Sequence, residues 1–193
     1  GRTMPLRRAR GYAPLPISLP VAVPPILAVG GELKATFCLA AGEDAFMSQH
    51  IGDLENLETL EAFGRAVDHF RHLFRIDPEI VACDAHPGYL GARWAAAWAG
   101  DRKLVRVQHH HAHLAALMAE HRCDGHAPLL GFSFDGTGYG ADGALWGGEV
   151  LIARYGSYQR VGHRSLARIH IRRCRDLPRL DLGCRPLFYK EQT

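Results

Sequence analysis

A run of histidines is the part of this sequence best suited to chemistry. Four of the chain's twelve histidines fall within positions 109–113, directly after the apolar segment 104–107. That segment predicts a short buried strand, and residues 114–119 are good helix formers. If the helix begins at or before His109, then His109 and His113 share one helical face. Two neutral imidazoles at this spacing can bind one divalent ion and leave positions for a carboxylate and for substrate. The alternative is a helix start whose histidines face water.

Length and composition fit one domain, or one and a half, with a substantial core. The chain has 193 residues and is 47% hydrophobic, and its formal net charge of +3 is too small to indicate a nucleic-acid partner. Its five cysteines form no CxxC pair, which is typical of free thiols in a reducing compartment. Because no apolar run approaches about twenty residues and no signal-peptide pattern is present, we expect a soluble, cytoplasmic protein without a membrane segment.

The first part of the chain predicts a linker followed by a small sheet. Prolines interrupt residues 1–25, which we expect to connect to an upstream domain. Strands are predicted at 26–29, 35–40 and 45–51, with a tight turn between the first two. The glycines and the lysine of that turn could cradle a phosphate, although a glycine pair between strands usually forms only a hairpin.

The middle of the chain alternates helices with short apolar strands. Apolar residues recur every three or four positions from 54 to 74, which predicts a helix with Asp53 as its N-cap. A strand at 80–83 runs into Asp84 and His86, at the kind of position where open α/β sheets place ligands. A helix cap followed by a turn explains these two residues equally well. The remaining predicted elements are a helix at 89–99, a strand at 104–107 and the histidine helix up to residue 121.

The last regular elements introduce a second glycine-rich turn. A strand at 128–134 runs into Asp135-Gly136-Thr137-Gly138-Tyr139-Gly140, which resembles a phosphate loop, and residues 146–155 form its partner strand. Three strands, then a helix, a strand, a helix, a strand and a helix is the ribonuclease-H-like order. We therefore predict an α/β fold of the actin-like ATPase superfamily. Its parts would be a first lobe at 26–126, the start of a second lobe at 127–162, and an atypical tail at 163–193.

Six stretches together resemble the C-terminal, Kae/TsaD-like part of the HypF-type carbamoyltransferases of NiFe-hydrogenase maturation. They are RRARGYAPLPI (7–17), GGELKATFCLA (30–40), SQHIGDLEN (48–56), CDAHPGY (83–89), VQHHHAHLAALMAEH (107–121) and FDGTGYGADGALWGGEV (134–150). The tRNA threonylcarbamoyl transferases are a related family. Two positions depart from the expected pattern, since Ala35 stands where asparagine is expected and Ala141 where a second acidic residue is expected. Neither departure removes a candidate ligand.

The resemblance implies a reaction and a set of site residues. An upstream YrdC-like domain would help to convert carbamoyl phosphate and ATP into carbamoyl-adenylate. This region would pass the carbamoyl group to the C-terminal cysteine of a HypE-type protein, for cyanide ligand synthesis. A divalent metal, zinc or iron, would be held by His109, His113 and Asp135. The residues assigned to the adenylate are Gly30, Gly31, Lys34, Ser48, His50, Gly136, Thr137, Gly138, Tyr139 and Gly140. We also predict that Lys34, His50 and Asp135 converge around one cleft.

Residues 163–193 lose the resemblance and are crowded with arginines, as a frameshifted or truncated reading frame would be. We predict that they do not pack as a second lobe, and that the chain is an incomplete fragment without transferase activity of its own. Three other functions stay open. One is an inactive metal- or nucleotide-binding half-domain, and another is a relative of the tRNA threonylcarbamoyl transferases. The third is a metal-dependent hydrolase that uses the histidine cluster with Asp84 and His86, although the sequence has no HExxH motif.

Overall fold

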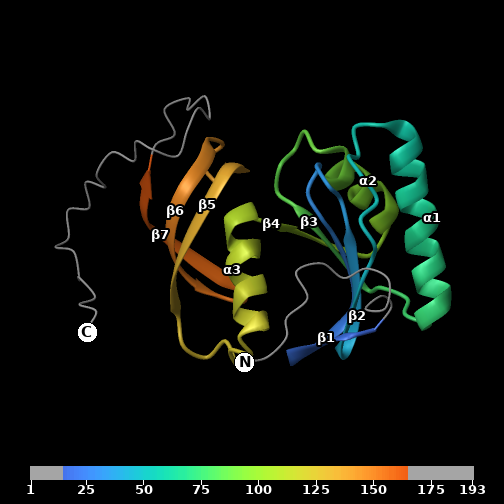
Figure 1. The fold of residues 1–193 in the computed structure, drawn as a ribbon, viewed down its shortest axis with the longest axis horizontal. Coiled ribbons are helices and arrows are strands. Elements are labelled where there is room, and N and C mark those ends of the chain that lie inside the picture. Colours follow the sequence, from blue (N-terminus) through green and yellow to red (C-terminus); the bar gives the residue numbers. More distant parts are fainter. Residues whose placement is uncertain (1–14, 165–193) are drawn as a thin grey trace, which may run out of the picture.

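A four-stranded mixed sheet forms the base of the first lobe. The computed structural model describes residues 15–164, and Figure 1 shows two β-sheets with one helix between them. The order in the first sheet is β2-β1-β3-β4. β1 and β2 are antiparallel, whereas β3 and β4 run parallel to β1. The strand bounds are β1 Ile17–Val29, β2 Phe37–Met47, β3 Ile80–Asp84 and β4 Lys103–Val107. The α/β class predicted from the sequence is confirmed.

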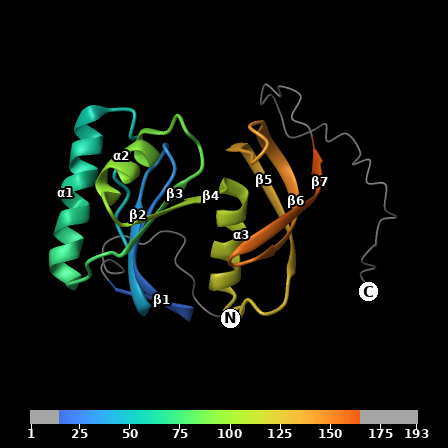
Figure 2. The same cartoon turned by 180° about the vertical axis from the view of Figure 1, so that it is seen from behind.

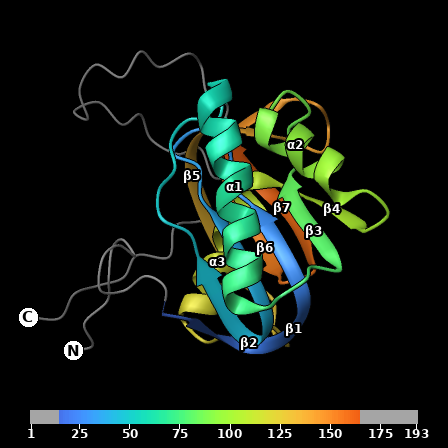
Figure 3. The same cartoon turned by 90° about the vertical axis from the view of Figure 1, so that its right-hand side faces the viewer.

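Helices cover both faces of this sheet. Helices α1 (Leu57–Phe74) and α2 (Leu90–Ala99) lie on one face, and α3 (His109–Glu120) lies on the other (Figure 3). The main core forms where α1 meets the sheet. There the fully buried ring of Phe37 makes edge-on contacts with Phe63 and Phe70, at centroid distances of 5.4 and 5.0 Å.

The predicted N-cap of α1 was wrong. The helix begins after Asn56, whose side-chain oxygen accepts a hydrogen bond from the backbone N–H of Glu58 at 2.8 Å. Asp53 instead accepts one from the backbone N–H of Lys34 at 2.7 Å, and so closes the turn that follows β1. The sequence prediction therefore gave the Asp53 carboxylate the wrong backbone partner. Nothing in the local sequence distinguishes an aspartate that caps a helix from one that closes a turn.

Two strand predictions were also wrong. β1 begins at Ile17 instead of Ile26, so residues 17–25 belong to the sheet and not to a linker. The prolines of this segment are accommodated because the β1–β2 register shifts between Ser18 and Ile26. Residues 45–47, predicted as the start of a third strand, are the end of β2. The part of the predicted linker at 1–14 lies outside the described residues.

The described part of the second lobe is a three-stranded antiparallel sheet. It consists of β5 (Leu129–Tyr139), β6 (Leu145–Arg154) and β7 (Ser157–Arg164), in that order, and it packs on the other side of α3 (Figure 2). Leu114 of α3 joins Trp146, Leu151 and Ala153 of β6 in a small buried cluster. The histidine helix therefore connects the two sheets.

Two sequence predictions concern this part of the chain, and only the first can be compared with the structure. Asp135 lies inside β5, because that strand continues through the glycine-rich segment that had been predicted as a loop. The predicted behaviour of the tail falls on residues that, from 165 onwards, lie outside the described part. Within residues 15–164, no helix is long and apolar enough to cross a membrane.

Candidate metal centre

His109 and His113 meet Asp135 where α3 approaches β5. The helix starts at His109 because Gln108 caps it, its Oε1 accepting from the backbone N–H of His111 at 2.9 Å. The Nε2 atoms of His109 and His113 are 3.2 Å apart. Oδ2 of Asp135 lies 2.6 Å from His109 Nε2 and 3.5 Å from His113 Nε2. One donor atom from each of these three side chains thus falls in a single group within 4.8 Å.

This donor set fits a divalent metal ion. Two imidazole nitrogens and one carboxylate oxygen form a catalytic set for zinc, and the same combination with open positions suits non-haem iron. The side chain of His109 is 22% exposed and that of His113 is 59% exposed. The cluster is therefore anchored on the His109 side and accessible on the His113 side, where further ligands could enter.

Asp84 contacts the other nitrogen of His109. Its Oδ2 lies 2.7 Å from His109 Nδ1, and its Oδ1 accepts the backbone N–H of His86 at 2.8 Å. The hydrogen bond to Asp84 raises the pKa of His109, although partial burial of the ring acts against the shift. From sequence, Asp84 was assigned only to the alternative hydrolase. Asp84 ends β3, and the neighbouring strand β4 ends two residues before His109. That position at the strand ends was the signal for its proximity to His109.

Within residues 15–164, His86 and Asp84 do not form a second group of possible metal ligands. Its ring stacks on Tyr89 at a centroid distance of 4.0 Å and meets the ring of Tyr139 edge-on at 5.3 Å. Its Nδ1 accepts the backbone N–H of Gly88 at 3.1 Å. Nδ1 of His86 is thus engaged in a turn, and the hydrolase alternative stays a prediction.

His110 and His111 face the second sheet. His110 is fully buried, and its Nδ1 lies 3.0 Å from Nε2 of Gln108. Because Oε1 of Gln108 is the capping acceptor, its amide nitrogen donates and His110 Nδ1 accepts. Burial lowers the pKa of His110. Nε2 of His111 donates to the carbonyl of Arg154 at 2.7 Å. These two histidines connect α3 to the second lobe, and their contacts direct them away from the cluster of three donors.

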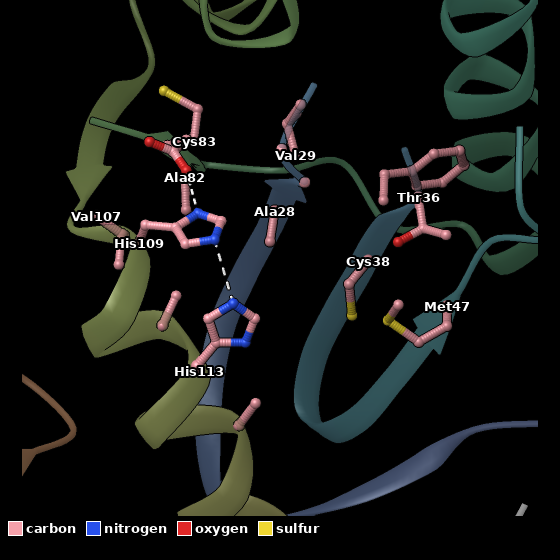
Figure 4. A pocket seen from close by; sticks show the side chains of 16 residues that line it. Ala28, Val29, Thr36, Cys38, Met47, Ala82, Cys83, Val107, His109 and His113 are labelled. Atoms are coloured by element: carbon pink, nitrogen blue, oxygen red, sulfur yellow. Dashed lines mark hydrogen bonds and ion pairs between the residues drawn. The ribbon is translucent and has the colours of Figure 1, made fainter. Parts of the chain in front are cut away.

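A cavity of about 530 Å³ opens beside the cluster, between the first sheet and α3 (Figure 4). Gly30, Gly31, His109 and His113 all contribute to its wall. Gly31 is close to the histidine, because a Cβ at this position would lie 3.9 Å from His109 Cε1. Most of the other lining side chains are apolar, among them Val29, Phe37, Met47, Val107, Ala112 and Ala116.

Three of the residues predicted to bind the adenylate, all from the first lobe, do not line this cavity. Lys34 and His50 are exposed, and Lys34 adopts a left-handed backbone conformation with φ 53°. Ser48 is buried, where its Oγ accepts the backbone N–H of Phe37 at 3.0 Å and donates to the carbonyl of Gln49 at 2.9 Å. The hydroxyl of Ser48 therefore has a structural partner, and convergence of Lys34, His50 and Asp135 stays a prediction.

The glycine-rich segment lies against the histidine helix and β6. Gly136 and Thr137 belong to β5. A Cβ on Gly138 would lie 2.4 Å from Cε1 of His110, and one on Gly140 would lie 2.0 Å from Nε1 of Trp146. The carbonyl of Tyr139 accepts from Nε2 of Gln108 at 3.3 Å. Packing against these neighbours is a reason for glycine at 138 and 140 in addition to the predicted phosphate contact.

Two family descriptions match most of the chain. The HypF Kae1-like domain matches residues 22–120, and the second subdomain of the carbamoyltransferase Kae1-like domain matches residues 131–170. Carbamoyltransferase HypF2 of Cupriavidus necator is 48% identical over 160 residues, which are 82% of this chain and 20% of that protein. Carbamoyltransferase HypF of Rhizobium leguminosarum bv. viciae is 41% identical over 157 residues, 81% of this chain and 20% of that protein.

Solved structures of HypF proteins are also similar to this chain. A crystal structure of full-length HypF in the phosphate- and nucleotide-bound form aligns with a TM-score of 0.74 at 48% identity, covering 80% of this chain and 24% of that one. The crystal structure of T. kodakarensis HypF aligns with a TM-score of 0.71 at 37% identity, covering 81% and 20%. The chain therefore spans about a fifth of the length of the curated relatives that it matches.

Proposed function

This chain belongs to the HypF carbamoyltransferase family, and from that premise we propose that it carries the carbamoyl-transfer site of a hydrogenase maturation enzyme. The donor would be carbamoyl-adenylate, made from carbamoyl phosphate and ATP by other domains. The acceptor would be the C-terminal cysteine of a HypE-type protein. In the transfer, the thiol sulfur bonds to the carbamoyl carbon as the bond from that carbon to the phosphate oxygen breaks. AMP leaves, and the thiol proton passes to solvent.

The single observation that carries this proposal is the meeting of His109, His113 and Asp135 at one point. We propose that they hold one divalent ion, zinc or iron. When bound, such an ion polarises a carbonyl oxygen as a Lewis acid, which is the help that carbamoyl transfer requires. His109 and His113 would each supply Nε2, and Asp135 would supply a carboxylate oxygen. Because the histidines come from α3 and Asp135 comes from β5, the ion would also hold the two lobes together.

The neighbouring residues would shape the space for the donor. Gly31 supports this role because it leaves the space beside Cε1 of His109 free of a side chain. The apolar wall of the cavity would limit the water around the reacting group, and water would otherwise hydrolyse the activated carbamoyl. Lys34 and the segment Gly136–Gly140 would hold the phosphate and ribose, as the family resemblance implies.

A chimeric enzyme tests the proposal. The matching segment of the Cupriavidus necator relative would be replaced by residues 22–164 of this chain, so that all other domains are supplied. Thiocarbamate on the C-terminal cysteine of the HypE-type protein would be measured by mass spectrometry. We expect transfer by the chimera and a loss of about a hundredfold or more with His109→Ala or Asp135→Asn. His72→Ala, at an exposed position on α1, is the matched control and should leave the rate unchanged.

A folded, metal-loaded chimera that forms carbamoyl-adenylate but leaves the cysteine unmodified would contradict the proposed function. Folding is checked by circular dichroism and metal content by elemental analysis. Adenylate formation is followed separately, as release of pyrophosphate from ATP. These three checks separate a failed graft from a transfer site that does not work.

A further inference from the structure

Asp84 is buried, and both of its carboxylate oxygens are engaged. Its side chain is 7% exposed, with Oδ2 at 2.7 Å from His109 Nδ1 and Oδ1 accepting the backbone N–H of His86 at 2.8 Å. The backbone sets this position. Asp84 pairs with Val107 in the parallel β3–β4 ladder, and Val107 lies only two residues before His109. The sheet thus delivers the carboxylate to the edge of the imidazole ring.

Two carboxylates face the two ring nitrogens of His109, Asp84 at Nδ1 and Asp135 at Nε2. An ionised carboxylate only accepts hydrogen bonds, so without metal each of these nitrogens faces an acceptor. When a metal ion takes the place between Nε2 and Asp135, Nε2 must give its lone pair to the ion, and the ring proton stays on Nδ1, where Asp84 accepts it. Within residues 15–164, His113 makes no comparable hydrogen bond through its Nδ1 and is 59% exposed. His109 is therefore the imidazole whose orientation the fold sets.

We propose that Asp84 is a positioning residue of the metal centre, which fixes the tautomer and ring orientation of His109 so that Nε2 can bind the ion. This inference rests on the proposed metal-dependent function and extends it to a residue that acts on the metal through His109. Carboxylates behind metal-binding histidines act in this way in other proteins, and their removal weakens metal affinity by roughly 10–100-fold.

Asp84→Asn gives a specific test, because the geometry predicts how the amide will sit. The amide oxygen is needed to accept the backbone N–H of His86, so the NH₂ group is left facing His109. An NH₂ group donates to Nδ1, which then keeps its lone pair, and the ring proton moves to Nε2. The variant retains the shape of the turn while placing the wrong tautomer at the metal position.

The chain offers a matched control in Asp124. Its Oδ1 accepts the backbone N–H of His126 at 2.9 Å, which repeats the turn of Asp84 and His86 two residues apart. Asp124 is exposed and contacts no imidazole through its other oxygen in the described structure. Asp124→Asn therefore changes the same charge in the same kind of turn, and we expect it to leave His109 and metal affinity unchanged.

Two measurements on the full chain test the proposal. The first is the ¹⁵N NMR shift of His109 without metal in an Asp135→Ala background, where no second carboxylate faces Nε2. It should report Nδ1–H when residue 84 is aspartate and Nε2–H in Asp84→Asn. The second is Zn²⁺ affinity by competition with a chromophoric chelator, which should fall about 10–100-fold in Asp84→Asn. Asp84→Ala loses both hydrogen bonds but imposes no wrong tautomer, so it should weaken Zn²⁺ binding less than Asp84→Asn does.

Failure of the Asp84 proposal and failure of the proposed metal centre give different results in these two measurements. An unchanged His109 tautomer in Asp84→Asn, with Zn²⁺ affinity within twofold of the wild type, would overturn it. A greater loss of affinity in Asp84→Ala than in Asp84→Asn would also overturn it, since that order indicates a packing role. If the wild type binds no Zn²⁺, the proposed metal centre fails, while the NMR shift still decides whether Asp84 sets the tautomer.

Discussion

Replacing Gly138 by alanine tests whether the glycine-rich segment of β5 is shaped by the histidine helix. The new Cβ would lie 2.4 Å from Cε1 and 2.7 Å from Nδ1 of His110, and 3.2 Å from Cβ of His109. His110 cannot easily move away, because it is fully buried and Gln108 holds its Nδ1. Gly138 is not among the glycines with positive φ, so the expected cost is steric and not conformational.

An overpacked contact of this kind costs about 1–3 kcal/mol of folding free energy. The strain should be relieved by movement of β5 away from the start of α3, since both histidines nearest to the new methyl group belong to that helix. Because Asp135 lies three residues earlier on β5, the same movement would pull it away from His109. We therefore expect Gly138→Ala to lose Zn²⁺ affinity as well as stability.

Urea unfolding gives the measurement. Trp146 is a suitable fluorescent probe because its ring lies 6.3 Å from that of His110. The midpoint should fall while the slope is unchanged, which indicates lower stability without a different unfolded state. Gly156→Ala is the control, since no heavy atom lies within 4 Å of its new Cβ, and its effect should stay within about 0.5 kcal/mol. If Gly138→Ala is as stable as Gly156→Ala, the packing argument is refuted.

Three further predictions concern the second lobe, the cavity and the whole chain. Glu149→Gln should lower stability by about 1.5–3 kcal/mol in urea unfolding, because fully buried Glu149 accepts two hydrogen bonds from Arg160 at 2.6 and 2.9 Å. Glu61→Gln, in an exposed pair with Arg65, should change stability by less than about 0.5 kcal/mol; equal effects would contradict this. Burial raises the pKa of Cys38 to about 11, so its alkylation rate, followed by mass spectrometry, should climb about tenfold per pH unit beyond pH 9. A plateau near pH 9 would be the contrary result. The 193-residue chain should not modify a HypE-type cysteine when given carbamoyl phosphate, ATP and the upstream activating domain in trans, because it spans about a fifth of the length of its relatives. Transfer at the rate of a full-length relative would refute that.

Helical periodicity was enough to predict that His109 and His113 share one face. A helix that starts at His109 places His113 on the same face, and the structure brings their Nε2 atoms to 3.2 Å. The opposite face carries His110 and His111 into the second lobe. Local helix geometry determines both placements, which is why the spacing alone was informative.

Contacts that depend on the register of distant strands were harder to predict. The approach of Asp84 to His109 follows from the parallel pairing of β3 and β4, which no local pattern specifies. The early start of β1 was missed because its prolines favour a linker, whereas the structure accommodates them where the ladder shifts register. The role of Ser48 was also missed, since its hydroxyl bonds to backbone atoms that only the folded turn brings together.

The metal content of single variants tests the central claim most directly. The chain and its variants would be loaded with Zn²⁺, freed of excess ion, and analysed for metal per folded chain. We predict one ion per chain in the wild type, a loss of this ion in His109→Ala, His113→Ala and Asp135→Asn, and its retention in the folded fraction of His110→Ala. Retention of the ion by His109→Ala, or equal loss from His109→Ala and His110→Ala, would contradict the assignment.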